Sequence, residues 1–464
     1  MNKLWQKNYT QNSIAEAYCF GDGAVLDNQL VLYDVLGSMA HAHMLSAIGI
    51  LTKEEDSALQ AQLSKILTLA AKGEFAVTAG DEDVHTKVEN FLAAALGPIG
   101  KKIHTGRSRN DQVLVDLRLY AKDQCLQLSL HCLDLAKQFT AFAGQYEFVP
   151  MPGYTHMQKA MPSSVGMWAA SFAESLLGDA DLIKSAYRYN DQNPLGSGAA
   201  YGVSLPINRE MTSKLLGFAK TQNNALYCQS SRVKGQLALM SAMTQLMLTL
   251  SRFAGDVLLF TTSEFNFFSV NPEICTGSSI MPQKKNVDVL EYLRARAHTV
   301  AGYEATVAAI AAGLPSGYNA DFGETKWPFM KSIEATGPSI QLVGLVLAAI
   351  QPNEKTLKDG CTPELYATHA AFDLVQKGMP FRDAYRVVGK AMEKLPVVNP
   401  FDILHQSNHI GGTGNLGLKT IAIAIQKNYA WWVSQRAMFI HHLRVLKGGE
   451  IYEKDNKICE SLLI

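Results

Sequence analysis

Four long stretches without proline dominate this sequence and constrain its fold most strongly. Their apolar residues recur at the three- to four-residue spacing of a helix rather than at the alternating spacing of a strand. The stretches span residues 112–148, 163–189, 232–265 and 286–312. Each is two to three times longer than the typical globular helix of about 11–12 residues. Such helices, apolar on wide faces, must pack against one another, so the sequence predicts an all-α fold with a central bundle of long helices.

Proline positions divide the chain further. A fifth apolar stretch, residues 329–350, contains Gly337-Pro338, where we expect a kink or a break. Beyond residue 351, five prolines punctuate shorter segments, which is typical of a separate small domain. A chain of 464 residues also exceeds the size at which a single core keeps growing. We expect an N-terminal helical domain at 1–111, a long-helix domain at 112–360 and a small C-terminal helical domain at 361–464.

Two local patterns support the helical interpretation. Residues 52–55, with the sequence TKEE, have the spacing of a capping box and predict the start of a helix that ends at Gly73. The methionines between residues 239 and 247 resemble an adaptable binding surface. Packing in the core is the better interpretation, because methionine fills irregular gaps between long helices.

The bulk composition excludes several classes of partner. Forty-two basic residues balance 42 acidic ones, which favours neither nucleic acid nor an anionic membrane surface. The longest continuous apolar run, residues 342–350, is about half of what a bilayer requires, and the first residues lack the pattern of a secretory signal. Seven cysteines are scattered without metal-ligand spacing. We expect free thiols, a cytoplasmic location, and neither a metal nor a cofactor.

Residues 277–286, with the sequence GSSIMPQKKN, form the most informative short segment. Gly277 permits unusual backbone angles, and hydroxyls, free N–H groups and two lysines lie within reach of one another. Such a loop can fold over an anionic ligand. Taken alone, the segment is better interpreted as a surface loop before the N-terminus of a helix.

Three segments together resemble one enzyme superfamily. The loop at 277–286 is similar to the signature of the fumarase/aspartase superfamily, whose members catalyse β-eliminations that release fumarate. Residues 104–112 (HTGRSRNDQ) and 152–158 (PGYTHMQ) resemble the argininosuccinate lyases and their relatives, the delta-crystallins. The resemblance implies cleavage of argininosuccinate to arginine and fumarate, an all-α three-domain chain, and a homotetramer with active sites shared between subunits.

The reaction that this resemblance implies needs a base, an acid and a group that stabilises a dianionic intermediate. Ser278 matches the family's catalytic serine and is the candidate base, with Lys284 beside it to bind the reacting carboxylate. From the residues alone, Ser278 serves equally well as a hydrogen-bond donor to that carboxylate. Asn286 is expected to bind the same end of the substrate.

The acid side is implied by the segment at 152–158. His156 matches the histidine that protonates the leaving nitrogen, and Glu291 matches the carboxylate that orients it. A lone histidine is otherwise more often structural. Thr155 is expected to bind a substrate carboxylate.

A further set of residues matches positions that bind substrate. Ser108, Arg109 and Asn110 precede a long helix, where hydroxyl, guanidinium and amide groups suit carboxylate recognition. Capping and a structural salt bridge are the simpler interpretation for Asp111 and Arg107. His85 ends an acidic turn at 80–85 and is expected to support the pocket. Substrate contacts are also implied for three residues on later segments: Arg232, Tyr318 and Lys326.

Several positions depart from the family pattern. The opening segment at 4–9 lacks the usual glycines and arginine, and Met161 and Val233 replace a glutamine and an aspartate. Gly23 and Gly323 stand where a serine and a glutamine that contact substrate are expected. Most of these losses lie on the side that grips the amino-acid end of the substrate, whereas the elimination residues are intact.

Three functions therefore compete. The first is an argininosuccinate lyase, including one that acts on a modified argininosuccinate. The second is a sister lyase such as adenylosuccinate lyase, fumarase or aspartase, against which the segment at 104–112 stands. The third is a non-catalytic structural protein like some delta-crystallins, which the intact catalytic residues disfavour.

Overall fold

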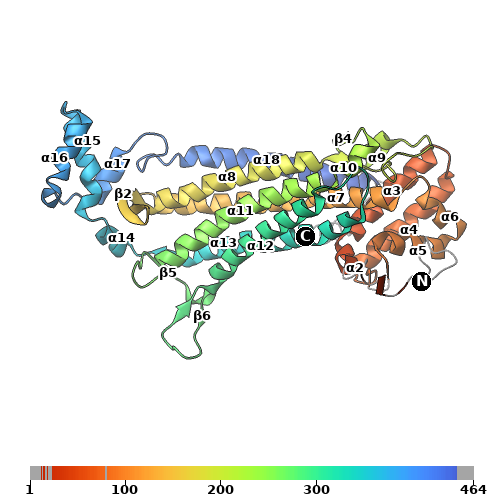
Figure 1. The fold of residues 1–464 in the computed structure, drawn as a ribbon, viewed down its shortest axis with the longest axis horizontal. Helices are drawn as coiled ribbons and strands as arrows, with labels where there is room; N and C mark the ends of the chain where they lie inside the picture. Colours follow the sequence, from red (N-terminus) through yellow and green to blue (C-terminus); the bar gives the residue numbers. More distant parts are fainter. Residues whose placement is uncertain (1–11, 13, 16–17, 19–22, 79–80, 447–464) are drawn as a thin grey trace.

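The computed structural model describes residues 12, 14–15, 18, 23–78 and 81–446 of the chain. The predicted opening departures at 4–9 and Gly80 lie outside these residues. The molecule is a long rod, with a group of shorter helices at each end (Figure 1). The N-terminal group comprises α2 (Gly23–Leu26), η1 (Asp27–Gln29), α3 (Val31–Ala47), α4 (Lys53–Ala71), α5 (Val84–Leu96), α6 (Pro98–Lys101) and η2 (Lys102–His104).

Five long helices form the shaft of the rod, and they confirm the predicted all-α fold. They are α7 (Arg109–Gln145), α8 (Val165–Asn190), α11 (Arg232–Phe260), α12 (Asp288–Ala311) and α13 (Lys326–Ala349). Helix α7 packs on α8, and α11 packs on α8, α12 and α13. Met240, Met243 and Met247 on α11 are fully buried, which confirms their predicted place in the core.

The remaining helices connect the shaft or close its far end. Connecting elements are α9 (Arg209–Leu215), α10 (Ala225–Ser230), η3 (Pro272–Ile274) and η4 (Ala320–Thr325). The C-terminal group comprises α14 (Glu354–Gly360), η5 (Pro363–Tyr366), α15 (Ala367–Gln376), α16 (Phe381–Gly389), η6 (Met392–Lys394), α17 (Pro400–Gln406) and α18 (Leu418–Leu446). Helix α18 returns along α7 and α8, while α15 and α16 share a small core of their own (Figure 1). The domain boundaries stay a prediction.

Within the described residues, β-structure is limited to four two-stranded pairs. Three pairs are antiparallel: β1 (Pro150–Thr155) with β2 (Gln158–Ser164), β5 (Phe268–Val270) with β8 (Ile350–Pro352), and β6 (Thr276–Gly277) with β7 (Lys285–Asn286). The fourth, β3 (Gln192–Asn193) with β4 (Lys220–Thr221), is parallel. Each pair fixes a loop at the end or side of the helical shaft rather than building a sheet.

Local sequence signals set the helix starts. Thr52 and Glu55 form the predicted capping box of α4, and Gly73 follows its end with φ of 73°. Ser108 and Asp111 form a second capping box at α7, so that helix begins three residues earlier than its apolar pattern suggested. Capping satisfies backbone N–H groups that the first helical turn leaves without partners.

We expected a kink or a break at Gly337-Pro338, and the break was wrong, because α13 runs unbroken through Pro338. Proline removes one backbone N–H from the helical ladder. The hydroxyl of Ser339 donates to the carbonyl of Ala335 at 2.7 Å, and Thr336 donates to Ser332 at 2.7 Å. Neither bond replaces the one that Pro338 removes, so burial of this part of α13 against the neighbouring helices is what keeps the helix continuous across the proline.

Two helical stretches, Ala225–Phe260 and Ala320–Ala349, are long and apolar enough to cross a bilayer by length and composition alone. They are longer than the continuous apolar run in the sequence, because scattered polar residues interrupt them. Half of the most apolar part of each stretch is buried inside the molecule, and core helices of globular proteins reach the same length and apolar character.

Candidate active site

The first turn of α7 gathers several of the predicted substrate-binding residues. Ser108 caps the helix, and its hydroxyl accepts a hydrogen bond from the backbone N–H of Asn110 at 3.3 Å. The guanidinium of Arg232, at the start of α11, donates to the carbonyl oxygen of Asn110 at 2.7 Å. The ring of Tyr318 lies 5.2 Å from that guanidinium. Residues from three distant segments therefore meet at one end of the shaft.

Lys326 extends this cluster toward the N-terminal helices. Its ammonium forms an ion pair with Asp27, whose other carboxylate oxygen accepts from the backbone N–H of Val84 at 3.1 Å. Asp27 is only 2% exposed. The pair fixes the start of α13 against α5 and η1. No pattern in the sequence predicted that Asp27 would be the partner of Lys326.

Arg109 faces acidic residues in this structure. Its guanidinium lies 2.5 Å from Glu82 and 2.8 Å from Asp83, and it also donates to the hydroxyl of Thr86 at 2.9 Å. Arg107, for which a structural salt bridge was expected, instead donates to the hydroxyl of Ser38 at 2.9 Å. The salt bridges therefore belong to Arg109. If Arg109 binds a substrate carboxylate as predicted, its guanidinium must contact that carboxylate together with Glu82 and Asp83.

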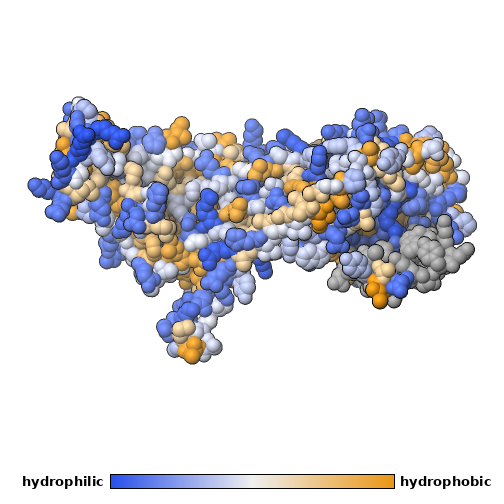
Figure 2. Space-filling view, viewed as in Figure 1, coloured by the Kyte–Doolittle hydropathy of each residue, from blue (hydrophilic) through white to orange (hydrophobic). Residues whose placement is uncertain are grey.

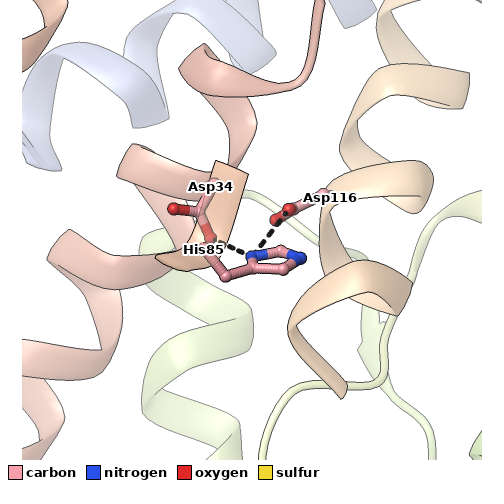
Figure 3. Close-up of side chains that lie close together, drawn as sticks. All are labelled: Asp34, His85 and Asp116. Carbon is pink, nitrogen blue, oxygen red and sulfur yellow. Dashed lines mark hydrogen bonds and ion pairs between the residues drawn. The ribbon is translucent and has the colours of Figure 1, made fainter. Parts of the chain in front are cut away.

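His85 is buried behind this cluster, between two carboxylates (Figure 3). Its Nδ1 lies 2.7 Å from Asp34 and 3.7 Å from Asp116. Burial lowers the pKa of His85, but the carboxylates of Asp34, Asp83 and Asp116 outweigh it and raise the pKa to about 9. Burial and the nearby Asp34 raise the pKa of Asp116 well above its ordinary value. The surroundings of His85 therefore favour its protonated, ion-paired form.

The same three side chains present ligand atoms close enough together to hold a metal ion. The geometry fits a proton better, because 2.7 Å is the length of a charge-assisted hydrogen bond. Two ligand atoms bound to one ion at about 2.0–2.1 Å each lie about 3 Å or more from one another, and an ion here would also face the nearby guanidinium of Arg107. Arg107 interacts electrostatically with both Asp34 and Asp116. We assign no metal to this cluster.

The predicted acid lies in a strained turn at the opposite end of the shaft. Thr155 pairs with Gln158 across the hairpin formed by β1 and β2. The two residues between them, His156 and Met157, both have positive φ angles, 52° and 60°. Two-residue hairpins favour this geometry, although residues other than glycine adopt it at a cost. The turn presents His156 to solvent.

The predicted base lies on a hairpin that stands away from the body of the molecule (Figure 2). Strands β6 and β7 pair Gly277 with Lys285, so residues 278–284 form the tip. The Ser278 Oγ accepts hydrogen bonds from the backbone N–H groups of Ile280 at 3.3 Å and Met281 at 3.1 Å. Two donors aimed at one oxygen favour its negatively charged form. Lys284 is exposed on the same tip.

The two groups of candidate residues lie far apart within one chain. Helix α7 has 37 residues, so its ends are separated by about 55 Å. Arg109 begins this helix, whereas His156 follows its far end. Glu291 lies in the first turn of α12 and is exposed, as is His156, and the described part of this chain contains no hydrogen bond between the two. A single chain does not assemble the predicted site.

The structure also locates the departures from the family pattern. Gly323 lies in η4, and a Cβ added to it would meet no atom within 4 Å. Val233 is buried beside Arg232, and Met161 is partly exposed on β2. Gly23 begins α2. The side of the site near Gly323 is therefore open in the single chain.

Comparisons with known proteins agree with the fold. The sequence model of a family described as Lyase matches residues 9–302. Among solved structures, EDDS lyase in complex with formate superposes with a TM-score of 0.81 at 22% identity, covering 98% of this chain and 97% of that chain. A class II fumarase from Schistosoma mansoni has a TM-score of 0.70 at 16% identity, covering 87% and 97%.

Curated relatives narrow the family. The chain is 39% identical over 388 residues to the argininosuccinate lyase of Thermotoga neapolitana, covering 84% of this chain and 98% of the relative. It is 41% identical over 414 residues to the argininosuccinate lyase of Parabacteroides distasonis, covering 89% and 92%. With the helical bundle and the motif residues in place, the chain belongs to the argininosuccinate lyase family.

Proposed function

We propose that this chain cleaves argininosuccinate to arginine and fumarate by β-elimination, the last step in making arginine. The observation that carries the proposal is the length of the similarity. Relatives named argininosuccinate lyase match 84–92% of the chain at close to 40% identity. Both the predicted elimination residues and most of the predicted substrate contacts are present.

The proposed reaction uses the residues in distinct steps. Ser278, as an alkoxide supported by the N–H groups of its own turn, removes a proton from the carbon beside a substrate carboxylate. Lys284 and Asn286 stabilise the negative charge that develops on that carboxylate. The bond between the adjacent carbon and the guanidine nitrogen then breaks, and its electron pair leaves with the nitrogen. His156, oriented by Glu291, supplies the proton that the nitrogen requires.

The other end of the shaft holds the rest of the substrate in this proposal. Arg232 and Asn110 offer a buried guanidinium and an amide for a carboxylate at this end. Thr155, beside His156 on the hairpin at the opposite end, adds a hydroxyl. Tyr318 and Lys326 border the position of the arginine part. Ser108 and Arg109 set the first turn of α7, and His85 supports that turn from behind.

We further propose a homotetramer in which different chains contribute to each active site. Helix α7, about 55 Å long, separates Arg109 from the hairpin of His156 and supports this arrangement, because partner chains running in opposite directions bring opposite ends together. Long helices with exposed faces offer surfaces for such packing. A cytoplasmic location, without a nucleic-acid or membrane partner, fits the balanced charge and the free thiols of Cys125, Cys132 and Cys228.

The experiment is fumarate release, followed by ultraviolet absorbance, from purified protein given argininosuccinate. Adenylosuccinate, malate and aspartate are tested alongside. Release from argininosuccinate alone is the expected result. Fumarate release from one of the other three compounds would identify the protein as a sister lyase. No fumarate release from any of the four compounds by a folded tetramer would overturn the proposal.

One observation favours a modified substrate as the second candidate. Gly323 replaces a residue that is expected to grip the amino-acid end, and the space around it is open. An argininosuccinate with a substituent on its α-amino group would fill that space. Comparing kcat/KM for argininosuccinate and its Nα-acetyl derivative distinguishes the two, and Gly323→Gln should shift the ratio toward the unmodified substrate.

A further inference from the structure

Arg232 is a buried cation without an anionic partner in the described part of the chain. The residue is 5% exposed. Both hydrogen bonds of its Nη2 go to neutral oxygens, the Asn110 carbonyl at 2.7 Å and the Gln229 side-chain amide at 2.9 Å. Its Nε has no partner. A buried charge of this kind is costly unless something compensates it, which points to a ligand that arrives with the opposite charge.

A second buried guanidinium adds to the positive charge around Arg232. Arg118 is also buried, and its guanidinium bonds to neutral groups, including the Asn190 side chain at 3.1 Å and the Ser231 carbonyl at 3.3 Å. Burial first, and then the charge of Arg118, lower the pKa of Arg232 to about 10, while Tyr318 and Asp111 oppose this shift. The aromatic rings of Tyr318 and Phe322 lie 5.2 Å and 5.9 Å from the Arg232 guanidinium.

Gln229 fixes the guanidinium through a closed ring of hydrogen bonds. The residue is fully buried on α10, and its amide nitrogen donates to the carbonyl of Gly198 at 3.5 Å. The N–H of Gly198 donates to the carboxylate of Asp111 at 3.0 Å. Asp111 follows Asn110 in the chain, and the carbonyl of Asn110 accepts from Arg232. The ring thus ties Arg232 to the first turn of α7 and to the loop after α8.

The identity of the side chain at position 229 matters because a glutamine orients the Arg232 guanidinium without neutralising its charge. A glutamate of the same size would accept the same bond from Arg232 but would form a buried ion pair with it. That pair would remove the charge that a ligand needs. We propose that Gln229 is a positioning residue that aims Arg232 and leaves its charge uncompensated, so that a substrate carboxylate serves as the counter-ion. This inference rests on the proposed function.

The test compares Gln229→Glu, which adds a charge at constant shape, with Gln229→Met, which keeps the volume and removes both hydrogen bonds. Gln245→Glu is the matched control, because Gln245 is exposed on α11. The assembled enzyme is used throughout, and circular dichroism and size-exclusion chromatography verify each variant. Two quantities are measured: kcat and KM for argininosuccinate, and the Kd of fumarate by calorimetry.

We expect Gln229→Glu to raise both KM and the fumarate Kd at least tenfold with a smaller change in kcat. Gln229→Met should raise them about three- to tenfold, since the charge persists but its direction is lost. Gln245→Glu should change neither. A purely structural role predicts equal effects of the two Gln229 substitutions, and that result would overturn the inference.

Each of the two Gln229 variants is sufficient by itself to test the inference. An unchanged fumarate Kd in Gln229→Met would overturn it even where Gln229→Glu does not assemble. The calorimetry also separates this inference from the proposed function. One outcome is that the wild-type enzyme binds fumarate without cleaving argininosuccinate, while both variants bind fumarate more weakly. That result would refute argininosuccinate as the substrate but support the role of Gln229.

Discussion

Asp27 and Lys326 form an ion pair although 299 residues separate them in the sequence. The pair links η1 to the start of α13, and the Asp27 carboxylate also accepts a hydrogen bond from the backbone N–H of Val84. Lys326 is therefore held by a carboxylate, whereas Arg232 is held by neutral groups. Lys326 and Arg232, two cations of the predicted substrate-binding end, thus differ in how much charge they offer to a ligand.

Replacing Asp27 should destabilise this end of the molecule. In Asp27→Asn, Lys326 loses its counter-ion and the Val84 N–H loses a charged acceptor. We expect the free energy of unfolding to fall by about 1–3 kcal/mol, seen as a lower midpoint of thermal unfolding. Asp321→Asn on the exposed face of η4 is the matched control. Equal midpoints for the two variants would show that the pair contributes nothing to stability.

Ser278 should be required for turnover and not for binding. Without the hydroxyl, Ser278→Ala has no group in the tip loop to remove the proton, so kcat should fall by at least about 10²–10⁴-fold. The Kd for argininosuccinate should stay within about threefold of the wild type, because Lys284 and Asn286 remain. Ser279→Ala is the control. Near-normal turnover in Ser278→Ala would remove this residue as the base.

Mixed assemblies test whether active sites are shared. His156→Asn and Ser278→Ala chains should each be inactive. After unfolding and joint refolding in equal amounts, each intact group has a chance of one half at any site, so about a quarter of the wild-type activity should return. Mass spectrometry identifies the mixed tetramers. Their complete inactivity would argue against a site built from different chains.

His85 should make stability depend on pH in a defined direction. Its pKa is raised to about 9 in the folded chain, against about 6.5 for an unperturbed histidine. The contribution of His85 to the free energy of unfolding is therefore fully present below about pH 6.5 and is lost as the pH rises through 9. The shift corresponds to a contribution on the order of 3 kcal/mol.

The comparison with His85→Asn isolates this contribution from other titrating groups. We expect the difference in unfolding free energy between the two proteins to narrow between pH 6 and 9.5. The carboxylates that face His85 are Asp34, Asp83 and Asp116, and Arg107 faces two of them. A difference that does not change over this range would mean that His85 is not protonated in the folded protein.

The long helices could be predicted because their apolar spacing is strong over many turns. Their starts were less accurate where a cap decides them, as at Ser108, since capping acts outside the apolar pattern. Pro338 misled the prediction because burial of α13 on both sides of the proline, which the local sequence does not reveal, outweighs the loss of one N–H. Fold class thus follows from periodicity, while boundaries depend on single side chains.

The candidate site divides in a similar way. The motif at 104–112 and the loop at 277–286 are continuous in sequence, so their residues could be named in advance. The partners of those residues could not: Glu82 and Asp83 for Arg109, Asp27 for Lys326, and Gln229 for Arg232. The partners of Arg109 and Lys326 lie on segments that only the folded chain brings beside them. Gln229 is three residues from Arg232, but the change of helix between α10 and α11 decides whether their side chains meet.

The length of α7 has a consequence for handling this protein in solution. With the base, the acid and the substrate-binding residues distributed over different chains, as proposed, folding and activity respond differently to dilution. A chain released from its partners keeps its helices and its circular dichroism but holds only fragments of a catalytic centre. Specific activity would then fall at low enzyme concentration without any unfolding, and a kinetic assay run too dilute would make an intact protein look defective.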